Sequence, residues 1–599
     1  MIRFNLMRCR FFLITLLFAA SLRGDEPPNV VIFLTDDQGW GDLSVNGNTN
    51  LSTPNIDSLA RDGATFENFY VCAVCAPTRA EFLTGRYHLR TGVTGVSEGE
   101  GRLNPEETTL ANLFQKSGYT TGAFGKWHNG TQSPYHPNDR GFDEFYGFTS
   151  GHWGHYFSPP LDHNGTKVRG EGYVVDDFTN KAISFIEENQ EKPFFCYLPY
   201  NTPHSPMMVD DDYYAKFKDV DPKLKHRDPE KEDIMVTRAA LAMCENIDWN
   251  VGRVLQTLDA LNLADDTIVI YFSDNGPNSY RWNGSMKGKK GSVDEGGLRS
   301  PFFLRWPGKV TAGSTEKQIT GAIDLLPTLA ELTGIESRTT YPVDGHSFAD
   351  KLGSDRSSSD HARPLFSSWR KRHTVRSERF RLDSKGALFD IHLDRGQTAD
   401  RSAEFPNEKA ILSQALTDYV NEMSLVTDLA EKRPFTVGFS QSTTLPARDG
   451  HATEAASGVK VGIRRSSKAP NNSFFENWTE ATDHIKWEIE TKKTGSFEAI
   501  VYYTCRPVDA GVSVELAFTS EHPPSTSSTR KTITEAFDPP LYDKSKERVT
   551  ESHYFVKDFK PVSLGILKLQ AGKGTLTLGN ARISGEEAID VHAIELIRQ

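Results

Sequence analysis

The residue best placed to do unusual chemistry in this 599-residue chain is Cys75. It begins a Cys-x-Pro-x-Arg pentapeptide at 75–79, and Leu-Thr-Gly-Arg follows at 83–86. Cys72 stands three positions earlier, and a Cys-x-x-Cys pair by itself would suit redox or zinc chemistry. No second cysteine pair follows at a spacing that would complete a zinc site, and a single cysteine is most often a small buried side chain. Cys75 must therefore be interpreted together with the rest of the pentapeptide and with the Leu-Thr-Gly-Arg segment that follows it.

Two clusters of acidic and amide side chains each follow a run of apolar residues. Asp36 and Asp37 come after the run at 29–35, and Asp274 and Asn275 come after a second such run. Their oxygens are hard ligands, which favour Ca²⁺ or Mg²⁺ over zinc. Asp and Asn also form turns and cap helices, so either cluster alone could be structural. Three carboxylates converging without a cation would be strongly disfavoured, so together the clusters predict a metal site.

Three further segments contain basic residues. A Gly-Lys-Trp-His motif contains Lys126 and His128, a Pro-His-x-Pro element contains His204, and a Lys-Gly-x-x-x-Glu-Gly-Gly-x-Arg stretch begins at Lys290. Taken singly, such a lysine is usually a solvated charge and such a histidine simply forms hydrogen bonds. Their occurrence together and in this order favours a site for an anion, because preorganised cations stabilise the charge of a transferring group.

Taken together, these motifs resemble those of the type I sulfatases, the arylsulfatase A-like family of the alkaline-phosphatase-like superfamily. The resemblance covers about residues 29–425. It implies that a maturation enzyme oxidises Cys75 to formylglycine. The hydrate of that aldehyde has two geminal hydroxyls, one to attack sulfur and one to expel sulfate from a sulfo-enzyme intermediate. The chain departs from the family pattern at Asn129, where the family often has Leu.

The resemblance also implies a role for each site residue. A Ca²⁺ ion, with Mg²⁺ as the alternative, would be held by four oxygen ligands and the modified cysteine, namely Asp36, Asp37, Asp274, Asn275 and Cys75. Lys126 and Lys290 would hold the sulfate oxygens, and Arg79 would anchor the hydrate. His128 would act on a formylglycine hydroxyl, and His204 would assist the leaving group. The implied activity is that of a sulfuric ester hydrolase acting on a sulfated carbohydrate or an aryl sulfate.

The elements that carry these residues alternate between strands and helices. This order predicts an α/β domain with a mostly parallel central sheet flanked by helices, spanning 29–355. Three strands and a long helix stand out, at 29–35, 193–198, 267–273 and 239–261. Ligands of such sheets bind beyond the carboxyl ends of the strands, which is where both acidic clusters fall. A small α+β subdomain is expected at 356–430. The aromatic and basic residues at 150–156 and 281–282 could shape a sugar-ring subsite or simply pack loops.

The C-terminal region has another pattern. A stretch rich in Ser, Thr, Ala and Asn at 440–480 is typical of a linker, and polar and apolar residues alternate beyond it. This alternation predicts an additional antiparallel β-sandwich domain at 435–599. Aromatic residues such as Trp487 and Tyr502 could hold sugars, as in carbohydrate-binding modules. Alternatively the domain packs against the catalytic core, and we expect this second arrangement with some contribution to the rim of the active site.

The N-terminus has the layout of a secretory signal peptide at 1–24. Arginines precede an apolar run at 11–20 that is too short to cross a bilayer and is followed by small residues. We therefore expect a secreted or periplasmic protein with no membrane anchor in the mature chain. The formal net charge of −12 argues against nucleic acid as a partner. The expected partners are the sulfated substrate and a formylglycine-generating enzyme.

Two other functions stay open at this stage. The first is a phosphomonoester or phosphodiester hydrolase of the wider alkaline-phosphatase-like group, since some phosphonate hydrolases share formylglycine. The second is a catalytically silent carbohydrate-binding protein in which Cys75 remains a thiol. The pentapeptide favours a sulfatase over both.

Overall fold

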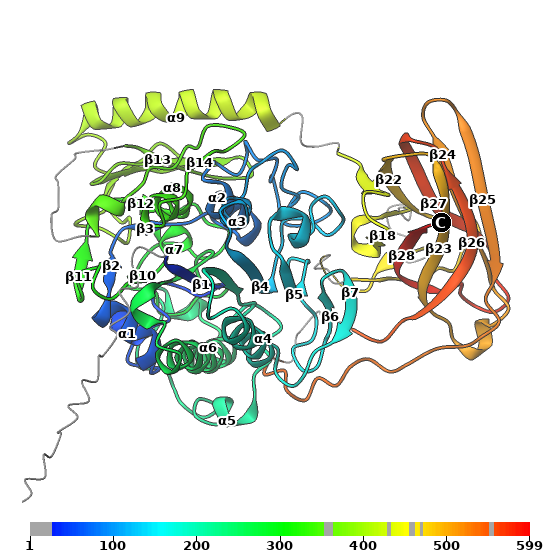
Figure 1. Ribbon diagram of the computed structural model, residues 1–599, viewed down its shortest axis with the longest axis horizontal. Coiled ribbons are helices and arrows are strands. Elements are labelled where there is room, and N and C mark those ends of the chain that lie inside the picture. Colours follow the sequence, from blue (N-terminus) through cyan, green and yellow to red (C-terminus); the bar gives the residue numbers. More distant parts are fainter. Residues whose placement is uncertain are drawn as a thin grey trace, which may run out of the picture.

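The computed structural model describes residues 27–352, 363–427, 433–453, 462–467, 471, 473–549 and 556–599. The signal peptide predicted at 1–24 lies outside these residues. Figure 1 shows a large α/β body joined to a smaller β-sandwich that lies beside it. Among the described residues no helix is both long enough and apolar enough to cross a membrane.

The α/β body is built on a ten-stranded sheet whose central strands are parallel. In spatial order the strands are β11 (Ser314–Glu316), β2 (Ala64–Phe66), β10 (Phe302–Arg305), β9 (Thr267–Ser273), β1 (Asn29–Thr35), β8 (Phe194–Pro199), β4 (Thr120–Lys126), β5 (Glu144–Phe148), β6 (Pro160–His163) and β7 (Thr166–Arg169). β1 pairs in parallel with both β8 and β9, and β4 pairs in parallel with β8 and β5. Antiparallel strands extend the sheet at both sides, as β10 does next to β9. The predicted mostly parallel α/β sheet is confirmed.

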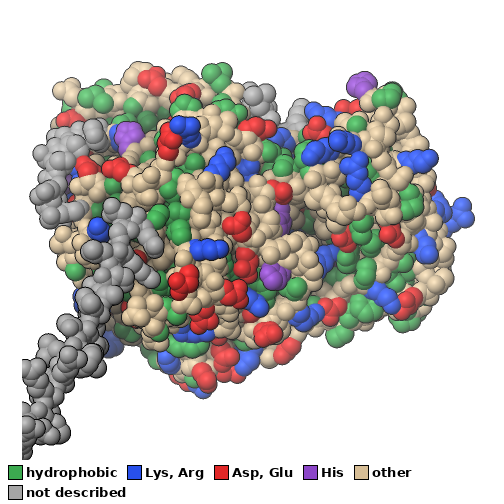
Figure 2. All heavy atoms as spheres, viewed as in Figure 1, with side chains coloured by type: hydrophobic (Ala, Val, Ile, Leu, Met, Phe, Trp, Pro, Cys, Tyr) green, Lys and Arg blue, Asp and Glu red, His purple; other side chains and the backbone are tan. Residues whose placement is uncertain are grey.

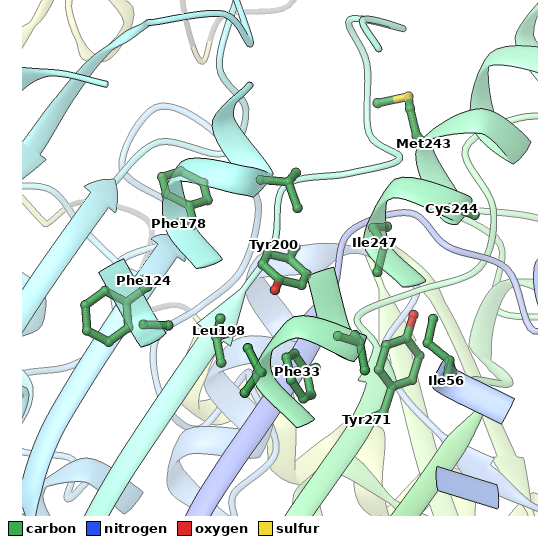
Figure 3. Packing of buried hydrophobic residues seen from close by; sticks show 14 of the residues in the cluster. Phe33, Ile56, Phe124, Phe178, Leu198, Tyr200, Met243, Cys244, Ile247 and Tyr271 are labelled. Carbon is green, nitrogen blue, oxygen red and sulfur yellow. The ribbon is translucent and has the colours of Figure 1, made fainter. Parts of the chain in front are cut away.

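Helices cover both faces of this sheet, because its central strands are apolar on both sides. β1 is buried throughout, with Val31 and Phe33 in one core and Val30 and Ile32 in the other. The first core lies under α1 (Pro54–Asp62), α4 (Val174–Glu188) and α6 (Ile234–Ala260), and the second under α2 (Cys75–Thr84), α3 (Leu110–Lys116) and α8 (Leu325–Leu332). Figure 3 shows Phe33 and Tyr271 of neighbouring strands packed with residues of α6. Shorter elements complete the body, namely β3 (Phe69–Tyr70), β12 (Thr320–Gly321), α5 (Asp211–Tyr214) and α7 (Glu295–Leu298).

A small α+β unit follows, as predicted. It consists of an antiparallel sheet and one long helix, β13 (Leu365–Trp369), β14 (Arg372–Arg376), β15 (Phe380–Leu382), β16 (Leu388–Asp390) and α9 (Pro406–Thr427). Arg376 and Arg381 reach from its strands to the buried Glu295, at 2.6 and 2.9 Å. Two arginines on one buried carboxylate tie this unit to the α/β body, since neither partner could be left alone there without cost.

The C-terminal domain is a sandwich of two sheets, antiparallel except where β17 joins β22. One sheet contains β17 (Phe435–Val437), β19 (His451–Ala452), β22 (Ile485–Thr491), β24 (Ser513–Ser520), β25 (Ser525–Thr532) and β27 (Gly572–Arg582). The other contains β18 (Ser442–Pro446), β20 (Arg464–Arg465), β21 (Phe475–Glu476), β23 (Gly495–Thr504), β26 (Lys560–Leu569) and β28 (Asp590–Arg598). Inward side chains such as Trp487 fill an apolar core between the sheets.

The described residues within 440–480 form strands of the sandwich, so the interpretation of this stretch as a linker is wrong for them. β18 pairs with β28 along its whole length, and β20 and β21 extend the same sheet. The polar composition suggested a linker because these strands are short and lie at the margin of the sheet, where few side chains face the core. A cavity of about 1060 Å³ lies between the sandwich, the α/β body and the small α+β unit, lined by Arg102, Met423, Glu488 and Lys573 among others. Figure 2 shows the surface hollowed between the two bodies.

Candidate active site

The acidic residues are brought together by the pairing of two strands. β1 and β9 run in parallel with Thr35 beside Ser273, so the residues that follow both strands emerge at the same edge of the sheet. The amide nitrogen of Asp37 donates to Oδ1 of Asp274 at 3.2 Å, and Nδ2 of Asn275 donates to Oδ1 of Asp37 at 2.8 Å. Asp37 has a φ of 67°, which a non-glycine residue adopts only when its surroundings hold it there.

Each carboxylate of this cluster contacts one basic side chain. Lys126, the last residue of β4, places Nζ 2.6 Å from Oδ2 of Asp36. Arg79 places Nη2 2.8 Å from Oδ2 of Asp274, and Nζ of Lys290 lies 2.6 Å from Oδ1 of Asp37. The contacting side chains are almost wholly buried except that of Lys290, which is 21% exposed. Strand order thus collects residues from four distant parts of the sequence into one site.

Cys75 is the first residue of α2 and lies against the acidic cluster. Its sulfur and one carboxylate oxygen each of Asp36 and Asp274 are all within 4.8 Å of one another. Burial raises the pKa of the Cys75 thiol, and Asp36 adds to the rise while Lys126 opposes it. The cysteine therefore lies at the same edge of the sheet as the acidic cluster.

The start of α2 is fixed by two residues to which the sequence analysis gave no role in the site. Thr78 donates its hydroxyl to the carbonyl of Asp274 at 2.6 Å and accepts from the amide of Cys72 at 2.9 Å. Asn129 donates Nδ2 to the carbonyl of Ala76 at 3.2 Å. The departure from the family pattern at Asn129 therefore supplies a buried hydrogen bond next to Cys75.

Both predicted histidines lie at this edge of the sheet, in different contacts. Nε2 of His204 is 3.6 Å from Oδ2 of Asp37, and its Nδ1 is 2.7 Å from the carbonyl of Ser205. Nε2 of His128 is 2.9 Å from the carbonyl of Val96, and its buried Nδ1 has no hydrogen-bond partner. A carbonyl can only accept, so the proton is on Nδ1 of His204 and on Nε2 of His128.

Burial and neighbouring lysines lower the pKa of both histidines. The pKa of His204 falls to about 3, chiefly through burial and Lys290, although Asp37 opposes the shift. The pKa of His128 falls well below its ordinary value through burial and Lys126. Both imidazoles are therefore neutral at pH 7, and the unshared Nδ1 of His128 is a proton acceptor.

The carboxylates respond to burial and to their cations in different ways. Burial raises the pKa of Asp274 to about 6, with Asp36 adding to the rise and Arg79 opposing it. Burial also raises the pKa of Asp36 despite Lys126. For Asp37 the effect of burial is outweighed by Lys290 and by the hydrogen bond from Asn275, and its pKa is lowered. Neighbouring carboxylates that pull their pKa values apart in this way are typical of functional sites.

The donor set fits a hard divalent cation. Oδ1 of Asp36 and Oδ1 of Asn275 are buried and have no hydrogen-bond partner, which is unusual for polar atoms in a folded protein. Oxygens from Asp37 and Asp274 lie beside them. Carboxylate and amide oxygens are the ligands that Ca²⁺ and Mg²⁺ prefer. All four oxygen-bearing residues expected from the sequence are thus at the same site.

Two residues of the suspected sugar-ring subsite, Arg281 and His152, are buried. Arg281 is 1% exposed and donates to Oδ2 of Asp42 at 2.6 Å and to the carbonyl of Asp37 at 2.9 Å. It therefore braces the turn after β1 and is not available to a sugar. His152 does lie at the site, with its ring stacked on that of His204 at 5.7 Å between centroids.

A sheet with this strand order and this gathering of charged residues at its strand ends defines a protein of the alkaline-phosphatase-like fold class. Residues 28–335 match the family model described as Sulfatase. The match covers more than half of the chain, and the chain therefore belongs to the sulfatase family. Members of this family generally use formylglycine and a divalent metal.

Three relatives illustrate the similarity. N-acetylgalactosamine-6-sulfatase of Mus musculus is 32% identical over 358 residues, covering 53% of this chain and 65% of the relative. Arylsulfatase A of Homo sapiens is 30% identical over 356 residues, covering 53% of this chain and 66% of the relative. The crystal structure of Ps i-CgsB in complex with k-i-k-neocarrahexaose is 29% identical with a TM-score of 0.58, covering 66% of this chain and 93% of that one. The chain thus spans slightly less than two thirds of the two sulfatases' length.

Proposed function

We propose that the protein is a secreted sulfuric ester hydrolase acting on sulfated carbohydrates, with aryl sulfates as model substrates. The observation that carries the proposal is the convergence of Cys75, Lys126 and Lys290 on one cluster of carboxylates. Two lysines near a nucleophile suit a substrate group with several anionic oxygens. The relatives named N-acetylgalactosamine-6-sulfatase and the neocarrahexaose complex support a carbohydrate as the substrate class.

In this proposal Cys75 acts after conversion to formylglycine, whose hydrate supplies the attacking hydroxyl. Lys126 and Lys290 hold the sulfate oxygens, and Arg79 holds the hydrate in place. Ca²⁺, or Mg²⁺ in its place, would be held by Asp36, Asp37, Asp274, Asn275 and the modified residue 75. When bound, the cation would act as a Lewis acid toward a sulfate oxygen. The catalytic unit is assigned to 29–355 with the subdomain 356–430, and the sandwich to 435–599.

The two histidines would divide the proton transfers. His128 offers an unshared lone pair at Nδ1, so it can take the proton of a formylglycine hydroxyl. His204 can protonate at Nε2, which faces Asp37. The bound sulfate, an anion, would favour uptake of a proton from solvent at this nitrogen, and the imidazolium would then donate that proton to the leaving sugar oxygen.

The mass of the peptide containing Cys75 tests the proposal. Co-expression with a formylglycine-generating enzyme should leave this peptide about 18 Da lighter, because CHO replaces CH₂SH. Turnover of an aryl sulfate should rise with the converted fraction. Full activity of Cys75→Ala would refute the proposed nucleophile. Rates on matched sulfate and phosphate esters of one alcohol would then separate a sulfatase from a phosphoester hydrolase.

A further inference from the structure

One residue of the sandwich region reaches into the active site of the α/β body. Asn471 is 9% exposed, and its Nδ2 donates to the carbonyl of Val96 at 2.9 Å. Its own carbonyl accepts from the hydroxyl of Ser150 at 2.5 Å. Both partners belong to loops of the α/β body that are more than 300 positions away in sequence. The contact therefore exists only when the two domains are docked.

The carbonyl of Val96 is also the partner of His128. It accepts from Nδ2 of Asn471 and lies 2.9 Å from Nε2 of His128. Gly151 confirms how closely these groups approach, since a Cβ at that residue would lie 2.1 Å from Nδ2 of Asn471 and 2.4 Å from Nε2 of His128. Asn471 and His128 thus pack against the same glycine and share one acceptor.

This shared acceptor controls which nitrogen of His128 is basic. Hydrogen bonding to Val96 keeps the proton on Nε2 and leaves the lone pair on Nδ1. His128 also has a φ of 68°, a conformation that a non-glycine residue holds only with support from its surroundings. A carbonyl oxygen can accept two hydrogen bonds, so the bond from Asn471 does not compete with that from His128. It fixes the acceptor that orients the imidazole.

We propose that Asn471 is a positioning residue, by which the C-terminal sandwich completes the active site of the α/β body. It acts through the Val96 carbonyl on His128 and does not touch substrate. This proposal rests on the proton-accepting role given to His128 above. The sandwich is then part of the catalytic unit and not a separable binding module. Arg448, also from the sandwich, lines the same small pocket as His128 and Asn471 and donates to Thr131 at 2.9 Å.

The simplest other explanation is that Asn471 only holds the domains together. Thr436 offers a matched control, because its hydroxyl bonds the carbonyl of Ser133 across the same domain boundary at 2.7 Å, without involving His128. The test compares Asn471→Ala, Asn471→Asp and Thr436→Val in the full, formylglycine-containing enzyme. Asp keeps the size of Asn but cannot donate to Val96, so it separates loss of the hydrogen bond from loss of volume.

With an aryl sulfate, kcat should fall about 10- to 100-fold in both Asn471 variants, as expected when the support of a catalytic group is lost. KM should change little, and Thr436→Val should keep wild-type kcat. In a His128→Ala background, Asn471→Ala should cause no further loss, because the group it positions is gone. Unchanged kcat in Asn471→Asp, or an equal further loss in the His128→Ala background, would overturn the proposal.

Hydrogen exchange keeps this test separate from the proposed activity. If Asn471 holds the Val96 carbonyl, amide exchange in the segment 94–101 should be faster in Asn471→Asp than in wild type or Thr436→Val. Exchange that is the same in all three proteins would contradict the inference. A wild-type enzyme that hydrolyses no sulfate ester would refute the proposed function, and the exchange rates would still decide whether Asn471 orders this loop.

Discussion

The α/β body and the C-terminal sandwich both bury charged residues, but they neutralise them differently. In the sandwich, Asp509 is 1% exposed and is satisfied by Arg506 at 2.6 Å and by the backbone amides of Glu586 and Glu587 at 2.7 and 3.1 Å. In the α/β body, Asp36, Asp37 and Asp274 crowd together, and oxygens remain without hydrogen bonds. A carboxylate whose oxygens accept hydrogen bonds from its own domain stabilises that fold. Carboxylates gathered from two strands and left incomplete indicate a site that awaits a ligand.

The comparison extends to aromatic residues. Trp487, which could have bound sugars, is wholly buried in the core of the sandwich. Tyr502 is covered by Lys167 of β7, whose Nζ lies 3.5 Å from the ring centroid, and its hydroxyl donates to Glu595. These residues therefore give no support to a carbohydrate-binding face, and Tyr502 instead contacts the α/β body.

Removing one carboxylate from each region should give the largest difference in metal content and turnover between two variants. Asp274→Ala should lose the metal and nearly all turnover, because the remaining ligands cannot hold a hard cation and Arg79 loses its partner. Asp509→Ala should be destabilised by about 1–3 kcal/mol yet keep its metal and its kcat. Metal content by mass spectrometry, kcat and the unfolding midpoint give the three readouts. Full activity of a thoroughly chelated wild-type enzyme would show that the carboxylates of the α/β body do not act by holding a metal.

Deleting the sandwich tests whether the two regions are separable. A chain ending near Pro434 should be insoluble or inactive on both an aryl sulfate and a sulfated polymer, since apolar surface would be exposed. It would also release the loop that follows His204, because Arg548 donates its amide to the carbonyl of Met207 at 2.9 Å and its Nη2 to that of Val209 at 2.7 Å. A soluble truncation that keeps aryl sulfate turnover and loses only polymer affinity would show instead a separable binding module.

The sequence predicted the convergent site better than it predicted the contacts between domains. The strands at 29–35 and 267–273 could be placed because each is a continuous apolar run, and parallel pairing then brings Asp36 and Asp274 together. Asn471 gave no such signal. It lies in a polar stretch that resembled a linker, and its partner is 375 positions away. Hydrogen bonds across a domain boundary leave no periodicity in the sequence.

His204 offers a narrower test within the α/β body. His204→Ala should slow hydrolysis of a sugar sulfate by about 10²–10⁴-fold and hydrolysis of an activated aryl sulfate far less, because acid assistance matters most for a basic leaving oxygen. The ratio of kcat/KM values on the two substrates is the measurement. Equal losses on both would mean that His204 has another role. His592→Phe in the sandwich is the matched control, and it should leave both rates at their wild-type values.

His592 shows that a shifted pKa does not by itself mark a catalytic group. Its pKa is lowered to about 3 by burial and by Lys167 and Arg448, much as that of His204 is lowered, yet its ring stacks on Phe559 at 4.8 Å. The unfolded chain binds a proton at this residue below its ordinary pKa of about 6.5, and the folded chain does so only near pH 3. The stability associated with the neutral ring is therefore present above pH 6.5 and is lost as the pH falls toward 3.

The difference between the pKa of His592 in the folded and in the unfolded chain gives the smallest effect that we predict, a change in stability with pH. Wild-type protein should lose about 1–2 kcal/mol of stability between pH 7 and pH 5 through His592 alone. His592→Phe keeps an aromatic ring for the stack but cannot be protonated, so its unfolding midpoint should fall less over the same range. Chemical denaturation at both pH values measures the change. Parallel losses in the two proteins would mean that the ring is protonated as readily in the folded chain as in the unfolded one. The packing around His592 would then have no electrostatic consequence, and the similarity between the pKa values of His592 and His204 would disappear.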